Sequence, residues 1–545
     1  MDERGDGLIK GAGIISALTL LSRALGLVRD CVCAAFFGAG MVWDAFSFAF
    51  RIPNLFRRLF GEGALSAAFV PAFTEHLELR EREEAWRLAG RVAGGLLLVL
   101  VALLIIGESA VLAIWRRPGL SPRWRLALGL TAVMLPYMVF ICLTALAGAA
   151  LNSLRHFAAP AFAPVVLNVC WIVAVAAVAP LVSPDPQVRI FVVACAILAA
   201  GVLQLGLQVA VLAGKGFRWR ISFTIRHPEV RRMGAVMAPV ALGMAAFQLN
   251  VLLDGVIAIS LAAPPDVPTF DVFGATIRYP MQLGANSVLY YGSRLMQVPL
   301  GVFGIAVATA AFPLLSASAA RKDWPAFSES LMRGLATVLF VGIPAGVGLM
   351  LLRYPAVEAV FERGAFTSAM TARTAPVLFA YSTAIWAYCA AHVLTRAFYS
   401  LKRPGTPAKV AACMVALNLA LNLTLVWRLQ EAGMAAATAI CAVVQVGVLY
   451  RLLGRRLRLA GQGRLLTVAW KTALSTTVMA LACWGTLRLL PGAAPDGAIG
   501  IKLLRLVLPA GAGLAAFLAA AAALRTEELA ALLRQLRHDR RAQAG

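Results

Sequence analysis

The sequence predicts an all-α polytopic membrane protein of 14 transmembrane helices, with two pseudo-symmetric six-helix lobes plus two extra C-terminal helices. Three observations lead to this prediction. The chain of 545 residues is 61% hydrophobic and 14% charged, with a mean hydropathy of +0.80, which is too apolar for one soluble core. Apolar runs of about 20 residues, enough to cross a bilayer as a helix, recur along its whole length. Short motifs repeat at a nearly constant offset, which indicates an internal duplication.

The apolar runs define the spans, and the first two meet at a tight Gly-Ala-Gly turn at 38–40. An even number of spans puts both termini on one side of the membrane. Basic loops at 215–232 and 451–464 and a basic tail at 525–541 assign that side to the cytoplasm. The expected spans are 8–37, 42–60, 91–115, 126–151, 159–181, 189–213, 234–262, 287–318, 330–352, 374–399, 408–427, 433–452, 468–490 and 502–524.

The internal repeat is visible at three places in the chain. Similar basic, proline-ended segments begin at Ser153 and Ser400, which are 247 residues apart, and Pro53 and Pro299 are 246 apart. The segments 68–71 and 311–313 agree with that offset within five residues. Because each copy has six spans, both insert the same way up, as in transporters whose two lobes rock about a central site. We expect lobes at 1–228 and 229–455, with 456–545 holding the last two spans and the basic tail.

Charged residues follow one face of each of the first two spans. Arg23 and Asp30 are seven residues apart, and Asp44, Arg51 and Arg58 repeat the same step, so each set lies along one side of its helix. One such charge near the bilayer centre costs roughly 2.5 to 3.5 kcal/mol, which is tolerable where it faces water, another charge or a ligand. The pattern therefore predicts a solvated, mostly cationic cavity.

Two residues near these charged faces bear on the shape of the first two helices. Arg29 lies about 100° from Asp30 on a straight helix, so it joins the stripe if Gly26 allows a bend or if its long side chain swings round. Pro53 removes a backbone donor inside the second span and predicts a kink close to Arg57 and Arg58.

The second lobe has polar residues of its own within predicted spans. Arg294 lies in the eighth span, where the pseudo-symmetry sets it opposite the arginines of span 2, and a snorkelling side chain explains it equally well. Four further residues could give oxygen ligands to a small hard cation, although hydrogen bonding between helices is the favoured explanation of such isolated polar residues. They are Asp254, Asn418, Asn422 and Thr438.

Several classes of function have no support in the sequence. The net charge of +24 falls largely in loops between spans, so we expect no nucleic-acid partner. The chain has no GxxxxGK[ST] loop for an ATP motor, no HExxH motif and no CxxC pair, so we expect neither an enzyme nor a catalytic metal. The nine cysteines lie in apolar runs, as small buried or lipid-facing residues do. What remains is binding, and fixed arginines suit a phosphate or diphosphate because guanidinium donates in a bidentate fork.

Several motifs in order closely resemble the MurJ (MviN) lipid II flippase family of the MOP exporter superfamily. They are SRALGLVRD from Ser22, RIPNLFRRLFGEGALSAAFVPAFTE from Arg51, YYGSRLMQVPLGVFG from Tyr290, FERGAFT from Phe361 and FYSLKRPGTPAKVA from Phe398. The resemblance implies alternating access and movement of lipid II, the undecaprenyl-diphosphate-linked peptidoglycan precursor, from the cytoplasmic to the periplasmic leaflet. It also implies that the last two spans form a groove for the lipid tail.

The resemblance also implies roles for particular residues. Arg29 and Arg294 are the first candidates for the diphosphate, Asp30 and Asp44 are gating partners, and Asn422 stands where a carboxylate is expected in a sodium site. Ser293 and Gln297 stand where relatives can carry acids beside the span 8 arginine. The implied substrate-binding residues are Arg23, Arg29, Arg57, Arg58 and Arg294, the charge partners are Asp30, Asp44 and Glu62, and the implied sodium ligands are Asp254, Asn418, Asn422 and Thr438.

The expected setting is the bacterial inner membrane. The expected partners are lipid II, membrane lipids and the cell-wall synthesis or division machinery. We expect no cofactor, with sodium or the membrane potential as the energy source. Three alternatives stay open: an exporter of another lipid-linked oligosaccharide or a drug, a membrane enzyme acting on polyprenyl phosphates, and a scaffold without transport. A drug exporter should have a more acidic or aromatic cavity, and an enzyme should have a catalytic constellation.

Overall fold

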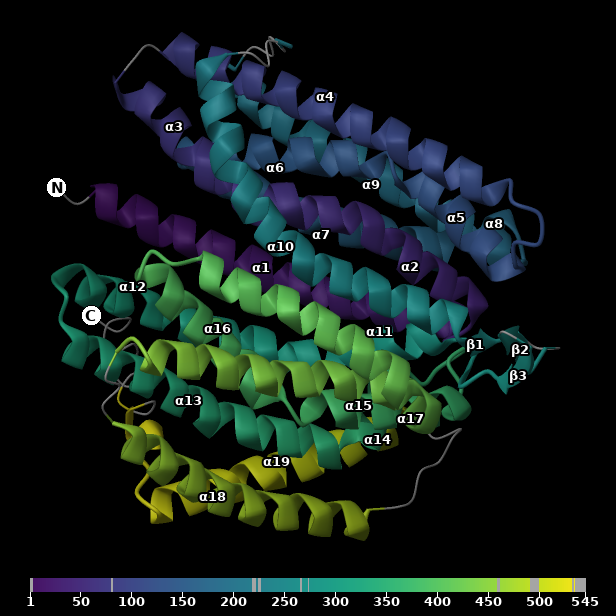
Figure 1. Cartoon of the computed structure of the whole chain (residues 1–545), viewed down its shortest axis with the longest axis vertical. Helices are drawn as coiled ribbons and strands as arrows, with labels where there is room; N and C mark the ends of the chain where they lie inside the picture. The colour runs from purple at the N-terminus through teal and green to yellow at the C-terminus, as the bar shows by residue number, and fades with distance from the viewer. Residues whose placement is uncertain are drawn as a thin grey trace. The chain divides into compact units, whose positions relative to one another are not determined.

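The prediction of a helical polytopic membrane protein is confirmed by the structure, a computed structural model of the chain (Figure 1). It describes residues 3–79, 82–217, 222–223, 227–264, 267–272, 274–457, 461–490, 499–531 and 534. Within these ranges, nine helices are long and apolar enough to cross a membrane, or ten if a pair bent by 43° at 383–384 is one span. The first two helices, which carry the charged stripes, are not among the nine, and the total of fourteen stays a prediction.

The chain divides into two compact units. Unit 1 comprises Met1–Ser260 with Arg363–Phe366, and unit 2 comprises Leu261–Glu362 with Thr367–Gly545. Unit 1 therefore extends through the helix that follows residue 228. A compact unit is a cluster of contacts and not a sequence repeat, so the division into lobes at 228 remains a prediction.

The described part of unit 1 contains helices and no strands. Its first helix packs against α7, its second packs against α5, and α6 and α7 both pack against α9. The elements are α1 (Glu3–Phe37), α2 (Met41–Phe56), η1 (Arg57–Ala64), α3 (Leu65–Leu79), α4 (Arg82–Trp115), α5 (Pro122–Met134), α6 (Tyr137–Ser153), α7 (Ala158–Val173), η2 (Ala174–Val178), α8 (Ala179–Val182), α9 (Pro186–Gly214) and α10 (Pro228–Ser260).

Unit 2 combines helices with a short β insertion. In this unit α11 packs against α15, α15 packs against α17, and α13 packs against α16 and α18. The elements are β1 (Ala262–Ala263), β2 (Thr269–Val272), β3 (Ala275–Arg278), β4 (Met281–Gln282), α11 (Ala285–Pro299), η3 (Leu300–Gly304), α12 (Ile305–Arg321), α13 (Trp324–Leu351), α14 (Arg353–Phe361), α15 (Ser368–Ser382), α16 (Ile385–Ser400), α17 (Gly405–Gly454), α18 (Gln462–Leu489) and α19 (Ile499–Ala523).

Two π-helical segments follow the prolines that the repeat pairs. The segment η1 begins at Arg57, four residues after Pro53 in α2, and η3 begins directly after Pro299. A proline removes one backbone donor and forces its neighbours out of the regular i to i−4 pattern, which favours a wider turn. Regular α geometry therefore ends at the point where the sequence predicts a kink.

The long loop between α10 and α11 contains a β-hairpin that the sequence reading did not anticipate. Strands β2 and β3 are antiparallel, with Phe270 opposite Ile277. The ring of Phe270 lies 4.5 Å from that of Tyr279, and Thr276 Oγ1 donates to Asp271 Oδ1 at 2.7 Å. Strands β1 and β4, on either side of the hairpin in the sequence, pair in parallel, and β4 leads to the start of α11.

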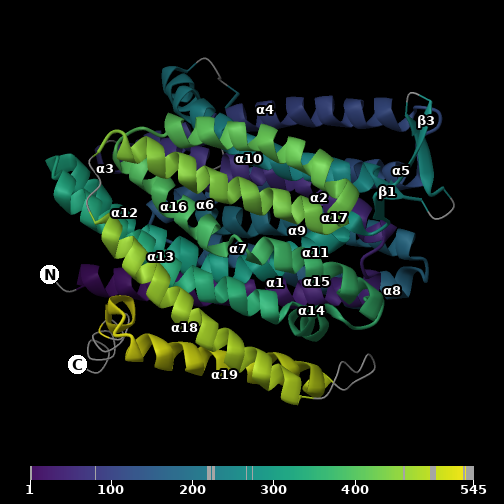
Figure 2. The same cartoon turned by 60° about the horizontal axis from the view of Figure 1, so that its bottom comes forward.

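The last two helices run side by side in both views (Figures 1 and 2). They pack with α13 around a small apolar core in which the ring of Phe340 lies 5.2 Å from that of Phe517. Their outer faces expose large apolar residues, such as Leu466 and Val507. Such surfaces suit lipid contact.

A sharp break in α17 separates the eleventh and twelfth expected spans. Gln430 has φ 53° and ψ −135°, so the helix stops there and restarts. Three residues later, a Cβ on Gly433 would lie 2.6 Å from the carbonyl oxygen of Leu425 and 3.1 Å from the Cβ of Leu429. Only a residue without a side chain allows the two halves of the helix to approach this closely.

We expect Gly433→Ala to lower the free energy of unfolding by about 2 kcal/mol, because its methyl group would meet backbone that cannot move aside. Gly447→Ala in the same helix is the matched control, since nothing lies within 4 Å of a Cβ at that position. It should leave stability unchanged or raise it by up to about 1 kcal/mol. Unfolding of the detergent-solubilised protein measures both, and equal stability of the two variants would refute the packing argument.

Candidate functional site

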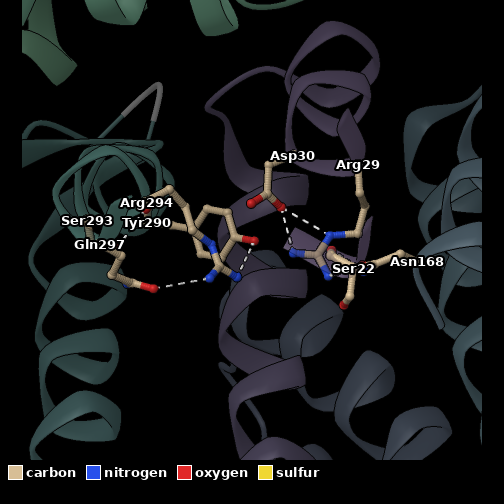
Figure 3. Close-up of polar contacts among 8 residues, drawn as sticks. All are labelled: Ser22, Arg29, Asp30, Asn168, Tyr290, Ser293, Arg294 and Gln297. Carbon is tan, nitrogen blue, oxygen red and sulfur yellow. Dashed lines mark hydrogen bonds and ion pairs between the residues drawn. The ribbon is translucent and has the colours of Figure 1, made fainter. Parts of the chain in front are cut away.

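In unit 1 several polar contacts hold Arg29, a candidate residue for binding the diphosphate (Figure 3). Arg29 on α1 is 8% exposed, and its Nε and Nη2 donate to Asp30 Oδ1 at 3.1 and 2.8 Å. Its Nη1 donates to Asn168 Oδ1 at 3.1 Å, and Asn168 in turn donates to the carbonyl of Ser22 at 3.1 Å. The guanidinium also lies 4.4 Å from the ring centre of Trp171. These contacts hold the charge in one orientation.

The structure resolves the two geometries considered for Arg29. Helix α1 continues through Gly26 without a break, so the long Arg29 side chain, and not a bend, brings the guanidinium to Asp30. Arg23, two turns earlier on the same helix, is exposed, whereas Asp44 on α2 is 4% exposed.

The arginines at the end of α2 lie where the helix changes geometry. Arg51 Nη1 donates to the carbonyl of Val251 on α10 at 3.1 Å, so it serves the packing of unit 1. Arg57 and Arg58 are half-buried in η1, and Arg57 Nε donates to Asn54 Oδ1 at 2.8 Å. The side chain of Glu62 lies outside the described residues.

In unit 2 Arg294 lies on α11 and donates hydrogen bonds to two neutral residues of the same helix (Figure 3). Its Nη2 donates to Tyr290 Oη at 2.9 Å, its Nη1 donates to Gln297 Oε1 at 3.4 Å, and its guanidinium lies 4.7 Å from the ring centre of Tyr290. Ser293 donates to the carbonyl of Tyr290 at 2.8 Å. A guanidinium stays charged at any physiological pH, so it can bind an anionic ligand.

The four residues considered for sodium do not all belong to one unit. In unit 2 Asn422 donates to Asn418 Oδ1 at 2.9 Å, and Asn418 donates to Thr438 Oγ1 at 3.4 Å. Asp254 belongs to unit 1, where Asn250 donates to it at 3.5 Å. Within the described residues, no group of three or more His, Cys, Asp or Glu side chains could hold a metal. The sodium site stays a prediction.

Two buried ion pairs in unit 2 were missed by the sequence reading. Lys502 Nζ on α19 lies 3.0 Å from Glu362 Oε1, and Arg505 Nη1 lies 3.0 Å from Glu358 Oε2. Burial raises the pKa of the Glu358 carboxyl, and Arg505 opposes that shift. The spacing of the charges could have predicted them. Lys502 and Arg505 are three residues apart and share one helical face, and Glu358 and Glu362, which are four apart, share another.

Together these contacts place an oriented guanidinium in each unit, Arg29 in unit 1 and Arg294 in unit 2. Arginine binds the oxygens of phosphate through two parallel N–H donors, and its charge persists at any physiological pH. Such side chains can bind an anion and release it again. The carboxylate of Asp30, which pairs with Arg29, is an alternative partner for this guanidinium when no anion is bound.

Comparison with known proteins places the chain in a family. A family model described as "Lipid II flippase MurJ" matches residues 33–499. A protein of Vibrio cholerae serotype O1 named "Probable lipid II flippase MurJ" is 35% identical over 82% of this chain and 82% of its own length. A protein of Rhizobium tropici with the same name is 32% identical over 87% of this chain and 86% of its own.

Solved structures show the same fold. One titled "Lipid II flippase MurJ, inward closed conformation" superposes with a TM-score of 0.71 at 24% identity, covering 92% of this chain and 98% of that one. An inward-facing multidrug resistance MATE family transporter of the MOP superfamily superposes with a TM-score of 0.64 at 14% identity, over 84% of this chain and 98% of the other. The chain therefore shares its fold with these two structures.

Proposed function

Because the chain belongs to the lipid II flippase MurJ family, we propose that it moves lipid II from the cytoplasmic to the periplasmic leaflet of the bacterial inner membrane. The observation that carries this proposal is the presence of an oriented arginine within a helix of each unit, Arg29 in α1 and Arg294 in α11. A diphosphate is a ligand that a guanidinium binds well, through two parallel N–H donors. Arg23, Arg57 and Arg58 add positive charge for the same headgroup.

The proposed mechanism is alternating access by the two predicted lobes. The headgroup crosses through a wet cavity while the polyprenyl tail stays in hydrocarbon, so only the polar part requires protein contacts. Asp30 and Asp44 hold the arginines when the ligand is absent and release them when the diphosphate arrives. The exposed apolar faces of α18 and α19 support a role for these helices as the path of the tail.

The membrane potential is the proposed energy source. It acts on each elementary charge with about 2.3 kcal/mol per 100 mV if the charge crosses the whole field. An inside-negative potential drives an anionic headgroup outward, which is the direction required. Both termini lie in the cytoplasm in this proposal, as the basic loops predict.

The function is tested by replacing the flippase of a bacterium with this chain. Depletion of the resident flippase should cause lipid II to accumulate in the inner leaflet, and this chain should restore leaflet-specific labelling from the periplasm. An exporter of drugs or of another lipid-linked oligosaccharide would leave lipid II inside. Failure to restore labelling by protein that is correctly inserted, as judged by its abundance in the membrane, would contradict the proposal.

A further inference from the structure

Arg373 on α15 joins three segments of unit 2. Its Nη1 donates to the carbonyl oxygen of Leu283 at 2.8 Å, and its Nη2 donates to that of Gln282 at 3.2 Å. The same Nη2 forms an ion pair with Glu431 Oε1. A guanidinium presents its donors in a rigid plane, so one side chain can hold three acceptors in a defined arrangement.

The carboxylate that pairs with Arg373 is itself fixed. Glu431 directly follows the break at Gln430 in α17, and it is 4% exposed. A buried carboxylate is strongly destabilising if its positive partner is removed. The ion pair therefore ties α15 to the turn in α17, which the close approach at Gly433 already makes rigid.

The two carbonyls belong to the residues just before α11. Gly284 follows them with φ 91° and starts the helix. One turn after Arg373 on the same face of α15, Val377 meets α11 a second time, since a Cβ on Gly292 would lie 2.8 Å from Val377 Cγ1. Helix α15 therefore holds α11 at its start by hydrogen bonds and near its middle by close packing.

Arg294 lies two residues beyond the second of these contacts. A guanidinium must be placed to within about 0.5 Å of its productive position to bind a diphosphate well. We propose that Arg373 is a positioning residue for Arg294, which it orients by holding the start of α11 against α15 and the turn of α17. This inference rests on the proposed function, because it assigns Arg294 to the anionic headgroup.

The first test is a double-mutant cycle on binding of undecaprenyl diphosphate to the full-length protein in detergent. Arg373→Gln should weaken binding about tenfold. In an Arg294→Gln background the same change should have little further effect, because Arg373 acts through Arg294. Arg373→Lys keeps the charge beside Glu431 and so protects folding, but it lacks the fork and should give an intermediate affinity.

The charge-swapped pair Arg373→Glu with Glu431→Arg separates the ion pair from the backbone contacts. It restores opposite charges, but glutamate cannot donate to the carbonyls of Gln282 and Leu283, so binding should stay weak. Arg333→Gln is the matched control, because Arg333 is 64% exposed in its pair with Glu329. Full rescue by the swap, or equal losses from Arg373→Gln with and without Arg294, would overturn the proposal.

A second measurement does not depend on the substrate. Spin labels at Val298→Cys on α11 and Leu429→Cys on α17 occupy positions that are 54% and 50% exposed, in protein whose accessible native cysteines are serine. Arg373→Gln should broaden their distance distribution, and an unchanged distribution would refute the positioning role. If the distribution broadens while Arg294→Gln leaves diphosphate binding intact, the positioning role stands and the assignment of Arg294 fails.

Discussion

Arg294→Ala is expected to reduce lipid II transport by about a hundredfold or more while the protein still folds and inserts. Hydrogen bonds to a charged group contribute roughly 1.5 to 3 kcal/mol each, so losing a bidentate contact with the diphosphate removes most of the binding energy at that point. Folding should survive, because Tyr290 and Gln297, which accept hydrogen bonds from Arg294, are neutral and do not become unpaired charges when it is removed. Leaflet-specific labelling of lipid II measures transport.

Two comparisons make this result specific to the guanidinium of Arg294. Arg294→Lys should recover part of the activity, because lysine keeps the charge without the fork. Arg29→Ala should also lose transport, but it removes the guanidinium beside Asp30, which is 4% exposed, so it should cost stability as well. Normal periplasmic labelling in cells carrying only Arg294→Ala would defeat the assignment.

The largest effect on stability is expected from Lys502→Met. Lys502 is 7% exposed and its Nζ contacts both Oε1 and the carbonyl oxygen of Glu362, at 3.0 and 3.3 Å. Removing it leaves a buried carboxylate that keeps the hydrogen bond from Thr371 but loses its positive neighbour. We expect the free energy of unfolding in detergent to fall by about 3 kcal/mol.

A double variant distinguishes the loss of a compensating charge at Glu362 from the loss of packing around Lys502. In Lys502→Met with Glu362→Met both charges are replaced by apolar groups of similar length, so most of the stability should return. Arg333→Met at the exposed pair with Glu329 should change stability by less than about 1 kcal/mol. A double variant as unstable as Lys502→Met would show that the ion pair is not the cause.

The sequence was sufficient for features that repeat along one helix. The apolar runs predict the helical membrane fold, and the seven-residue spacing puts Arg23 and Asp30 on one helix face, with Arg29 reaching Asp30 by its own length. Prolines shortly precede two of the π-helical segments in the described residues, η1 and η3. Each of these depends on residues within a few turns of one another, where helical periodicity determines which side chains meet.

Contacts between distant segments could not be predicted in the same way. Arg373 and Glu431 are 58 positions apart, and Lys502 and Glu362 are 140 apart. No periodicity links such residues, because their meeting depends on how whole helices pack. The β-hairpin was missed for another reason, since its strands are four residues each and lie in a loop between two much stronger apolar signals.

The π segments η1 and η3 differ in their positions relative to the arginines. Each residue of an α-helix turns the chain by about 100°. Conversion of one wide π turn into α geometry would therefore rotate the rest of the helix about its axis. Arg57 and Arg58 lie inside η1 and would be swept around the helix axis, whereas Arg294 precedes η3 and would stay in place while α12 rotated. The two prolines that the predicted repeat pairs would therefore have different effects: the first would change the orientation of two arginines, and the second would change the orientation of a helix.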